Sequence, residues 1–426
     1  MKSISFTTGE FKQEKTSAWL VAFVKYAQKL DFVSLLDEVK VKMKKVDYSV
    51  RHKLVTLAIS IAAGCEYTSD INEKLVPDTV VAELIDIPRF PDQSQINELL
   101  RRMTNQNVEQ LKNVHHQLFM QNAACLSATE KVVVDIDQSG LIANGKTYET
   151  AQKGYFCKKK NQKGYQLSAA FCGGKNRETI SLYLDPGNTH CSDRFDDLLN
   201  DTLAKLKDVA RESRLILRLD SGYGSEKNIE KLKNKVKFVA KGYSTTRAAN
   251  IAKTIAKEEY EEIDRFVDTY ELPSEGSLRF VIVRTLTRKG DFVHTMLISN
   301  ISKAEMSTHE LFHFYNQRQT IEAFFNTCKN IYHMKNLRTR KFDGIHAFLW
   351  IVFITHNIIS WMKNTVFHET DMENVGIGTL INKLGTLVAE VRRTAGTIEI
   401  VLPEISALAR KFVECMQQKP KSIWQT

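Results

Sequence analysis

The sequence is poor in proline and glycine, with 7 Pro and 19 Gly among 426 residues. Disordered linkers are usually rich in such residues, so we expect a chain that is folded nearly end to end. Cysteine is also sparse: the seven residues are scattered, odd in number, and show neither CxxC nor Cys/His ligand spacing. This pattern argues against a disulfide framework or a zinc site, and it predicts reduced, mostly packed thiols in a cytosolic compartment.

The chain also lacks a clear membrane-spanning run. The most apolar stretch, Ile345 to Trp361, is slightly short for a span and contains His346, His356 and Asn357, which predicts a buried helix instead. The first fifteen residues have no apolar segment of the kind that a secretory signal needs. We therefore expect a cytoplasmic protein with no membrane partner.

Negative charge is too scarce to balance positive charge. Sixty Lys and Arg stand against fifty Asp and Glu, which gives a net charge of +10 and an isoelectric point near 9.0. A basic chain favours a polyanionic partner, and nucleic acid is the first candidate. The length and the 43% of hydrophobic residues allow a large core in two or three domains, or in one elaborated domain.

Residue patterns divide the chain into four segments. Helical periodicity dominates at first, β-branched runs then alternate with helical stretches, and "LRFVIVRTLTR" with "FVHTMLISN" predicts two antiparallel strands. We predict an α/β fold with a mixed sheet flanked by helices. Its segments would be a helical N-terminal domain with a basic run that could bind DNA or serve as a scaffold (1–126), an α/β core (127–257), a β-rich insertion (258–303), and a helical region reaching nearly to the C-terminus (304–426).

Carboxylates end two of the predicted strands. "VVVDIDQSG" carries Asp135 and Asp137, and "LILRLDSGYG" carries Asp220 before a glycine-containing turn. Functional groups collect at strand ends in open sheets, although a single aspartate there can also cap the next turn. Asp135 shares a strand face with Asp137, so it could be a second ligand or a neighbour, and we favour Asp137.

A third carboxylate lies in a segment predicted to be one helix, 314–332. At about 100° per residue, Tyr315, Arg318, Glu322 and Lys329 fall within roughly 60° of one another, beside an apolar stripe. Taken alone, this ridge could be a solvated face with an Arg-Glu pair. Three carboxylates gathered together would repel one another unless cations are bound, and oxygen ligands suit Mg²⁺ or Mn²⁺. The combination predicts a divalent-metal site for phosphoryl transfer.

These motifs resemble those of bacterial insertion-sequence transposases with an RNase H-like DDE catalytic domain, of the subgroup marked by Tyr-x2-Arg-x3-Glu-x6-Lys. Tyr315, Arg318, Glu322 and Lys329 match that pattern at every position. "DQS" at Asp137 and "DSGY" at Asp220 match the contexts of the family's two aspartates, and "LDPGNTH" is similar to its Pro-Gly-Asn turn. The resemblance extends over roughly residues 87–363.

The resemblance implies an enzyme that cleaves and joins DNA strands at the ends of an insertion sequence by cut-and-paste transposition. Asp137, Asp220 and Glu322 would be the catalytic residues and would hold two Mg²⁺ ions, for which Mn²⁺ could substitute. Tyr315, Arg318 and Lys329 would hold phosphates of the transposon end. The implied partners are double-stranded transposon ends and target DNA, bound by a homodimer in the bacterial nucleoid.

Members that cleave through a DNA hairpin stack a flipped base on a tryptophan of the β insertion. No tryptophan lies between Asp220 and Glu322 here. Any aromatic face can stack a base, so the insertion offers four substitutes. These are Phe266, Tyr270, Phe280 and Phe292.

Two further basic stretches could contact the DNA backbone. A solvated turn is the alternative for the first of them. Their residues are Lys158, Lys159, Lys160 and Lys163 in "CKKKNQKGY", and Arg338, Arg340 and Lys341 in "KNLRTRKF".

Two other functions remain open from the sequence. One is a DNA-binding protein that descends from a transposase and is no longer catalytic, although such a protein needs no cluster of three repelling carboxylates. The other is an RNase H-like nuclease or resolvase, which would have no need for the full Tyr-Arg-Glu-Lys ridge.

Overall fold

The chain folds into two compact units. A computed structural model describes residues 3–9, 14–43, 47–156, 161–174, 177–274, 276–394 and 397–418. One unit combines residues 1–124, 142–151 and 325–426, and the other combines residues 125–141 and 152–324. We call them the helical unit and the sheet unit. The chain crosses between them several times, and the four segments proposed from the sequence stay a prediction.

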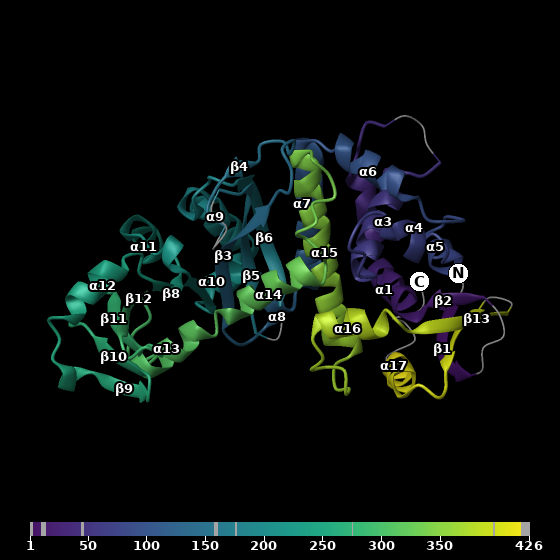
Figure 1. The fold of residues 1–426 in the computed structure, drawn as a ribbon. Helices are drawn as coiled ribbons and strands as arrows, with labels where there is room; N and C mark the ends of the chain where they lie inside the picture. Colours follow the sequence, from purple (N-terminus) through teal and green to yellow (C-terminus); the bar gives the residue numbers. More distant parts are fainter. Residues whose placement is uncertain are drawn as a thin grey trace. The chain divides into compact units, whose positions relative to one another are not determined.

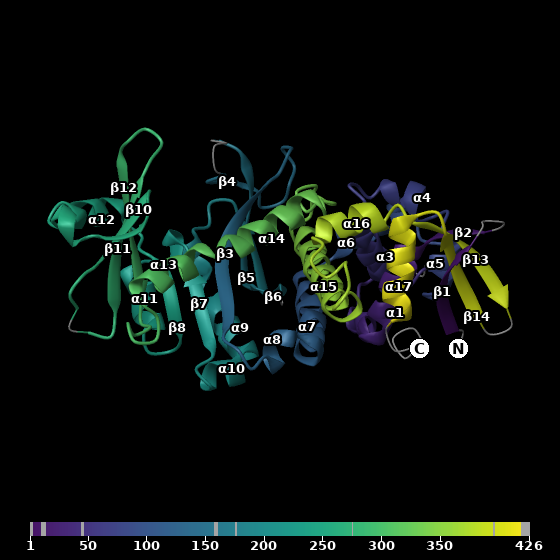
Figure 2. The same cartoon turned by 90° about the horizontal axis from the view of Figure 1, so that it is seen from below.

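The sheet unit is built on a large mixed sheet (Figures 1 and 2). Within the described residues its order is β4-β5-β3-β7-β8-β12-β11-β10-β9, with β6 paired to β5. β3, β7 and β8 are parallel neighbours, whereas β5 and β6 are antiparallel. The predicted α/β class with a mixed sheet is confirmed. The strands of its first half are β3 (Val132–Ile142), β4 (Gln152–Lys153), β5 (Lys163–Cys172), β6 (Glu178–Pro186), β7 (Leu215–Leu219) and β8 (Lys237–Lys241).

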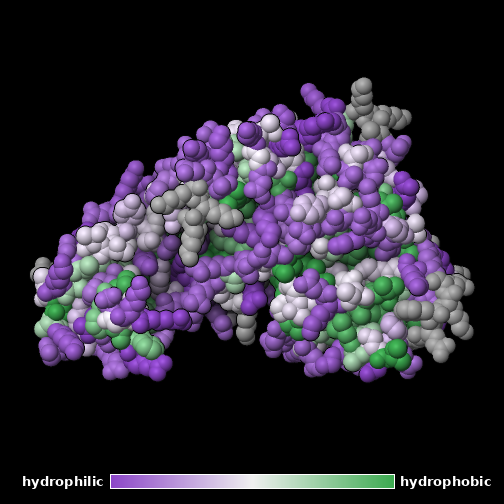
Figure 3. Space-filling model, viewed as in Figure 1, coloured by the Kyte–Doolittle hydropathy of each residue, from purple (hydrophilic) through white to green (hydrophobic). Residues whose placement is uncertain are grey.

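The β insertion extends this same sheet. β12 pairs antiparallel with β8 over three residues and with β11 over its full length, which confirms the two predicted antiparallel strands. In the space-filling view, the surface in the region of the insertion is mainly hydrophilic with small hydrophobic patches (Figure 3). The insertion strands are β9 (Glu261–Asp264), β10 (Val267–Glu271), β11 (Arg279–Leu286) and β12 (Phe292–Ser299).

Short helices connect and cover the strands of the sheet unit. Burial explains their packing: β7 and the first half of β3 consist mainly of buried β-branched residues and leucines, which need cover on both faces. The helices are α8 (Ala124–Ser127), α9 (Phe195–Lys205), α10 (Lys207–Arg211), α11 (Glu226–Leu232), α12 (Thr245–Ala252), α13 (Thr308–Asn316) and α14 (Gln319–Asn330), whose residues from Phe325 on belong to the helical unit.

The helical unit packs around one apolar helix, α15 (Phe342–Val366). Among the described residues, α15 is the one helix whose length and composition would allow it to cross a membrane, but 94% of its most apolar window is buried inside the structure. The predicted buried helix is therefore confirmed. α15 packs against α1 (Ala18–Lys29), α3 (Val50–Ala62), α6 (Gln93–Arg102) and α7 (Asn105–Asn122). The other helices of the unit are α2 (Phe32–Leu35), α4 (Asp70–Lys74), α5 (Thr79–Glu83), α16 (Ile377–Leu384) and α17 (Ala407–Gln417).

The helical unit also contains a small sheet that the sequence analysis did not predict. Its order is β1 (Ser3–Gly9), β14 (Thr397–Pro403), β13 (Val388–Thr394) and β2 (Lys15–Ser17). The expectation that helices hold nearly to the C-terminus is wrong here. β14 forms a parallel ladder with β1 from the other end of the chain, and its β-branched residues suit such pairing.

Candidate active site

Two adjacent parallel strands carry the aspartates singled out by the sequence. Ile136 of β3 lies opposite Leu219 of β7. The following residues, Asp137 and Asp220, therefore lie at the same edge of the sheet. Asp137 is still within β3, whereas Asp220 directly follows β7 and precedes a 3-10 turn. The parallel register thus brings together two carboxylates that are distant in sequence.

Arg318 connects these aspartates to the helical glutamate. Its Nη1 lies 3.0 Å from Asp137 Oδ2, and its Nη2 lies 3.7 Å from Asp220 Oδ1 and 3.3 Å from Glu322 Oε1. Arg318 is only 8% exposed, whereas the Glu322 side chain is largely exposed. The three carboxylates named from the sequence therefore surround one buried cation.

The electrostatics of this cluster are strongly coupled. Burial raises the pKa of Asp137, and the neighbouring Arg318 opposes that shift. Burial alone would lower the pKa of Arg318, but Asp137, Tyr315 and Asp220 hold it above its ordinary value. A buried carboxylate group of this kind needs a positive partner to stay ionised.

The segment that carries the ridge is not one helix, as its sequence suggested. α13 ends at Asn316 and α14 begins at Gln319, so Arg318 lies in the turn between them. In an uninterrupted helix the Arg318 N–H would donate to the carbonyl four residues back, that of Phe314. Here the Phe314 carbonyl accepts a 2.8 Å bond from Arg218, and the Arg318 N–H donates to the Tyr315 carbonyl instead. A tertiary contact thus accompanies the break.

Aspartates at the ends of adjacent parallel strands, together with a glutamate on a nearby helix, form the arrangement that the DDE resemblance predicts. A family model described as transposase DDE domain group 1 matches residues 17–421. The chain belongs to this family. The RNase H-like fold expected from the resemblance is confirmed with it. No curated protein matches the chain.

Membership of the DDE transposase family defines the class of activity. The protein is a transposase that acts on DNA, in the class of polynucleotidyl transferases and endonucleases, and its chemistry depends on divalent metal ions. The residues around Arg318 suit such an ion. All three acidic side chains offer oxygen ligands, which Mg²⁺ and Mn²⁺ prefer. They also already surround a cation in this structure.

In the transposase, Asp135 makes its own set of contacts, separate from the three carboxylates around Arg318. The Asp135 side chain is fully buried and makes a bidentate ion pair with Arg218, with contacts of 2.7 and 2.9 Å. Thr320 donates a further 2.7 Å hydrogen bond to Asp135 Oδ2. Both Asp135 oxygens are therefore engaged by Arg218 and Thr320, and these contacts favour the interpretation of Asp135 as a neighbour of the site.

The basic residues named from the sequence occupy different environments. Lys163 is exposed at the start of β5, and Lys158, Lys159 and Lys160 lie outside the described residues. Since Lys163 begins a strand of the catalytic sheet, it is the described residue of this stretch that can serve as a contact to DNA.

The second basic stretch lies in the helical unit. Arg340 and Lys341 are exposed and contact Thr147 and Glu149. Arg338 is buried, donates to the Cys65 carbonyl and lies over the Phe348 ring. Burial lowers the pKa of Arg338 to about 10. These contacts favour a structural role for Arg338.

Aromatic residues of the β insertion differ in exposure. Phe266 and Phe292 are 46% and 45% exposed, whereas Tyr270 and Phe280 are half-buried. The Arg284 guanidinium lies over the Phe292 ring, 4.8 Å from its centroid. Of the four predicted substitutes for a stacking tryptophan, Phe266 and Phe292 offer the larger free surface.

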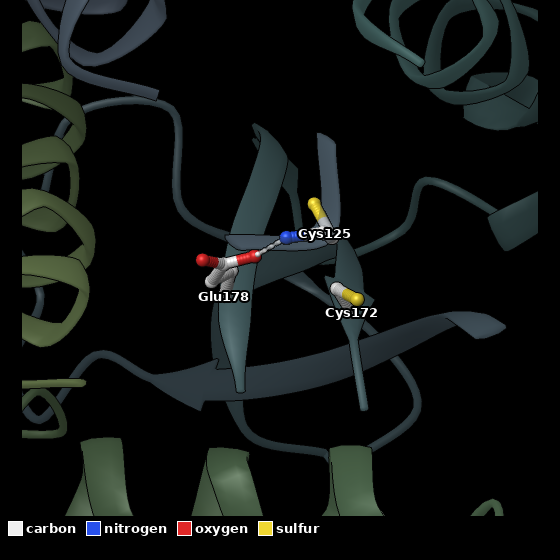
Figure 4. A group of neighbouring side chains, drawn as sticks. All are labelled: Cys125, Cys172 and Glu178. Atoms are coloured by element: carbon white, nitrogen blue, oxygen red, sulfur yellow. Dashed lines mark hydrogen bonds between the residues drawn. The ribbon is translucent and has the colours of Figure 1, made fainter. Parts of the chain in front are cut away.

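A separate buried cluster contains Cys125, Cys172 and Glu178 (Figure 4). Among the described residues it is the one group of three potential ligands whose ligand atoms all lie within 4.8 Å of one another. Glu178 accepts a hydrogen bond from the Cys125 backbone N–H. The hydrogen bond to Cys172, with burial, raises the pKa of the Cys125 thiol, which disfavours the thiolate that a metal requires. We assign this cluster to packing.

Two residues of the site escaped the sequence analysis: Arg218 and Thr320. A signal for Arg218 was present, because it precedes Asp220 by two residues just as Asp135 precedes Asp137. When two parallel strands pair Asp137 with Asp220, they also place Asp135 opposite Arg218, two residues earlier on the same sheet face. Thr320 gave no comparable signal.

Proposed function

We propose that this transposase cleaves and joins DNA strands at the ends of an insertion sequence by a cut-and-paste pathway. Asp137, Asp220 and Glu322 are the catalytic carboxylates in this proposal, and they hold two Mg²⁺ ions, for which Mn²⁺ can substitute. The observation that carries it is the convergence of these three side chains on the Arg318 guanidinium. A protein that only bound DNA would have no use for acidic groups gathered in this way.

The three carboxylates lie on two kinds of structural element. Asp137 and Asp220 are fixed by the β3 and β7 ladder, whereas Glu322 lies in the first turn of α14. Bound divalent cations would activate an attacking hydroxyl and stabilise the leaving oxygen of the phosphodiester. The protein's part is to hold the oxygen ligands at a fixed edge of a rigid sheet.

The ridge residues bind the phosphates of the transposon end in this proposal. Arg318 is placed beside all three carboxylates, so its guanidinium can neutralise a non-bridging oxygen next to the reacting bond. Tyr315 packs in α13 and supplies a phenol, and burial raises its pKa, so it stays a hydrogen-bond donor. Lys329 lies two turns after Glu322 on α14.

Contacts farther from the chemistry would hold the rest of the duplex. We assign this role to exposed Lys163, Arg340 and Lys341, and to the lysines at positions 158 to 160. Such contacts add affinity without sequence preference. A homodimer in the DNA complex would allow both element ends to be processed together.

A strand-transfer assay with the DNA that flanks this gene tests the proposed function. The protein, Mg²⁺ and a labelled element end are expected to give a nicked or excised end and then a product joined to target DNA. Binding without any cleavage, under conditions where the protein is folded, would favour the DNA-binding alternative. Cleavage of branched DNA regardless of end sequence would favour a nuclease or resolvase.

Replacing Arg318 or Lys329 by alanine should lower cleavage or strand joining by about ten- to a thousandfold, or about 1.4–4 kcal/mol of transition-state stabilisation. Each change removes a charge-assisted contact at the reacting centre. Rates are measured under single-turnover conditions. Lys253→Ala removes the same charge from an exposed position that directly follows α12, and it serves as the control.

The structure predicts different folding stabilities for the Lys329→Ala and Arg318→Ala variants. Lys329→Ala should hardly affect unfolding. Arg318→Ala leaves half-buried Asp137 without its cation, so a lower melting temperature is expected in the absence of Mg²⁺. If both variants cleave and join at the unmodified rate, Arg318 and Lys329 do not act at the reacting centre and the assignment is wrong.

A further inference from the structure

A buried ion pair lies on β3 and β7, two residues before Asp137 and Asp220 on each strand. Asp135 and Arg218 are opposite each other in the parallel ladder and are 0% and 2% exposed. Because side chains alternate along a strand, they share the sheet face of Asp137 and Asp220, each two residues further on. The pair thus connects the two strands directly beneath the carboxylates.

The same ion pair holds both sides of the break between α13 and α14. Arg218 Nη1 donates to the Phe314 carbonyl in α13 at 2.8 Å. Thr320, the second residue of α14, donates to Asp135 Oδ2 at 2.7 Å. Arg318 lies between these two anchor points and Glu322 lies two residues after the second. Both site residues are therefore carried by backbone that is attached to the Asp135 and Arg218 pair.

A glycine leaves the room that this arrangement needs. Gly173 follows β5, and its N–H donates to the Val133 carbonyl of β3. A Cβ on Gly173 would lie 2.8 Å from Thr320 Oγ1 and 3.4 Å from Asp135 Oδ2. Any larger residue at this position would push the threonine hydroxyl away from the aspartate.

Stability alone does not explain the pair. Buried ion pairs often contribute no more to folding than apolar residues of similar size would, so a charged pair at this place points to a requirement for geometry. Polar groups behind the ligands of a metal site commonly fix the orientation of those ligands. Thr320 and Arg218 occupy such positions relative to Glu322 and Arg318.

We propose that Asp135, Arg218 and Thr320 are positioning residues that set where Glu322 and Arg318 lie against Asp137 and Asp220. This role rests on the proposed function of the carboxylates. The residues themselves touch neither DNA nor the reacting atoms. They act by fixing the start of α14 on the strand pair that carries the aspartates.

The sheet unit contains a matched control. Arg279 makes a bidentate pair with Glu271, at 2.7 and 3.0 Å, and donates to the Met306 carbonyl, while Thr308 at the start of α13 donates to Glu271 Oε2. This second acid, arginine and threonine group anchors the other end of α13. It holds none of the three catalytic carboxylates, so Thr308→Val removes an equivalent hydrogen bond without disturbing the start of α14.

The test compares Thr320→Val with Thr308→Val, since valine keeps the shape of threonine and loses the hydroxyl. In Thr320→Val, we expect single-turnover cleavage to fall about 10- to 100-fold, and Mn²⁺ binding to the DNA-free chain, followed by electron paramagnetic resonance, to weaken within the same range. Thr320→Ser should restore both values, because the hydroxyl is kept. Thr308→Val should resemble the unmodified chain in both measurements.

Gly173→Ala provides an independent second variant. The added Cβ should displace the Thr320 hydroxyl and give the losses of Thr320→Val while every polar group remains present. Melting temperatures of all variants are recorded, so that a change in folding is separated from a change in metal binding.

The outcomes separate the positioning role from the proposed function. If Glu322→Gln loses cleavage and Mn²⁺ binding but Thr320→Val keeps both, the positioning role is wrong and the proposed function stands. Equal losses in Thr308→Val and Thr320→Val would also overturn the positioning role. If Glu322→Gln cleaves at the full rate, the proposed function itself is wrong.

Discussion

Asp220→Asn is expected to reduce strand cleavage at transposon ends by at least about a thousandfold, equivalent to about 4 kcal/mol of transition-state stabilisation. The substitution keeps the size of the side chain and removes one of the negative charges that surround Arg318. An amide is a much weaker ligand for Mg²⁺ than a carboxylate. Rates are measured with a labelled element end under single-turnover conditions.

Binding and folding should survive this change. Asp220 holds no phosphate in the proposed complex, and loss of a negative charge reduces repulsion of DNA, so the affinity for the element end should be unchanged or higher. Asp208→Asn removes a charge from exposed helix α10 and should have no effect on cleavage. Cleavage by Asp220→Asn at more than about a tenth of the unmodified rate would contradict the assignment of this carboxylate.

Removal of divalent cations should abolish cleavage and strand joining while the complex with the element end persists. The three carboxylates leave their charge only partly compensated by Arg318, and the chemistry at the phosphodiester needs Lewis-acid assistance. Addition of Mg²⁺ or Mn²⁺ should restore the rate. The experiment combines a chelator titration of cleavage with a gel-shift measurement of the same samples.

The number of ions can be measured separately. Titration of the DNA complex with Mn²⁺ should show two bound ions in the unmodified protein and fewer in Asp137→Asn. Full cleavage in an excess of chelator would rule out the metal-dependent mechanism. Retained cleavage with a single bound ion would preserve the carboxylate assignment and reject the two-ion proposal.

The sequence by itself was sufficient to predict those secondary-structure elements that depend on neighbouring residues alone. Runs of β-branched residues before Asp137 and Asp220 predicted two strands, and the register of β3 and β7 places these aspartates next to each other. The predicted end of the first strand was wrong, because β3 continues past Asp137 to Ile142. The apolar stretch around Trp350 predicted the buried helix α15. Such patterns follow from the alternation or the helical repeat of neighbouring side chains, which a sequence displays directly.

Local patterns failed where a distant partner decided the outcome. The apolar and charged periodicity of residues 314–332 favoured one helix, but a side chain from β7 occupies the Phe314 carbonyl at the break. β14 forms a hairpin with β13, a local pattern that the sequence analysis overlooked, whereas its parallel ladder with β1 involves the opposite end of the chain. The contact at the Phe314 carbonyl and the ladder with β1 depend on residues that no sequence window contains.

Only the tertiary structure showed which contacts the two neighbouring acids, Asp135 and Asp137, make. Asp135 and Asp137 are indistinguishable as strand residues, yet the parallel register places Arg218 opposite Asp135 and leaves Asp137 beside Arg318. An ion pair needs its two partners within a few ångströms, and strand pairing sets that distance across more than eighty intervening residues. The composition and spacing of the motifs therefore determined the chemistry available, while the register of two strands determined which side chains could perform it.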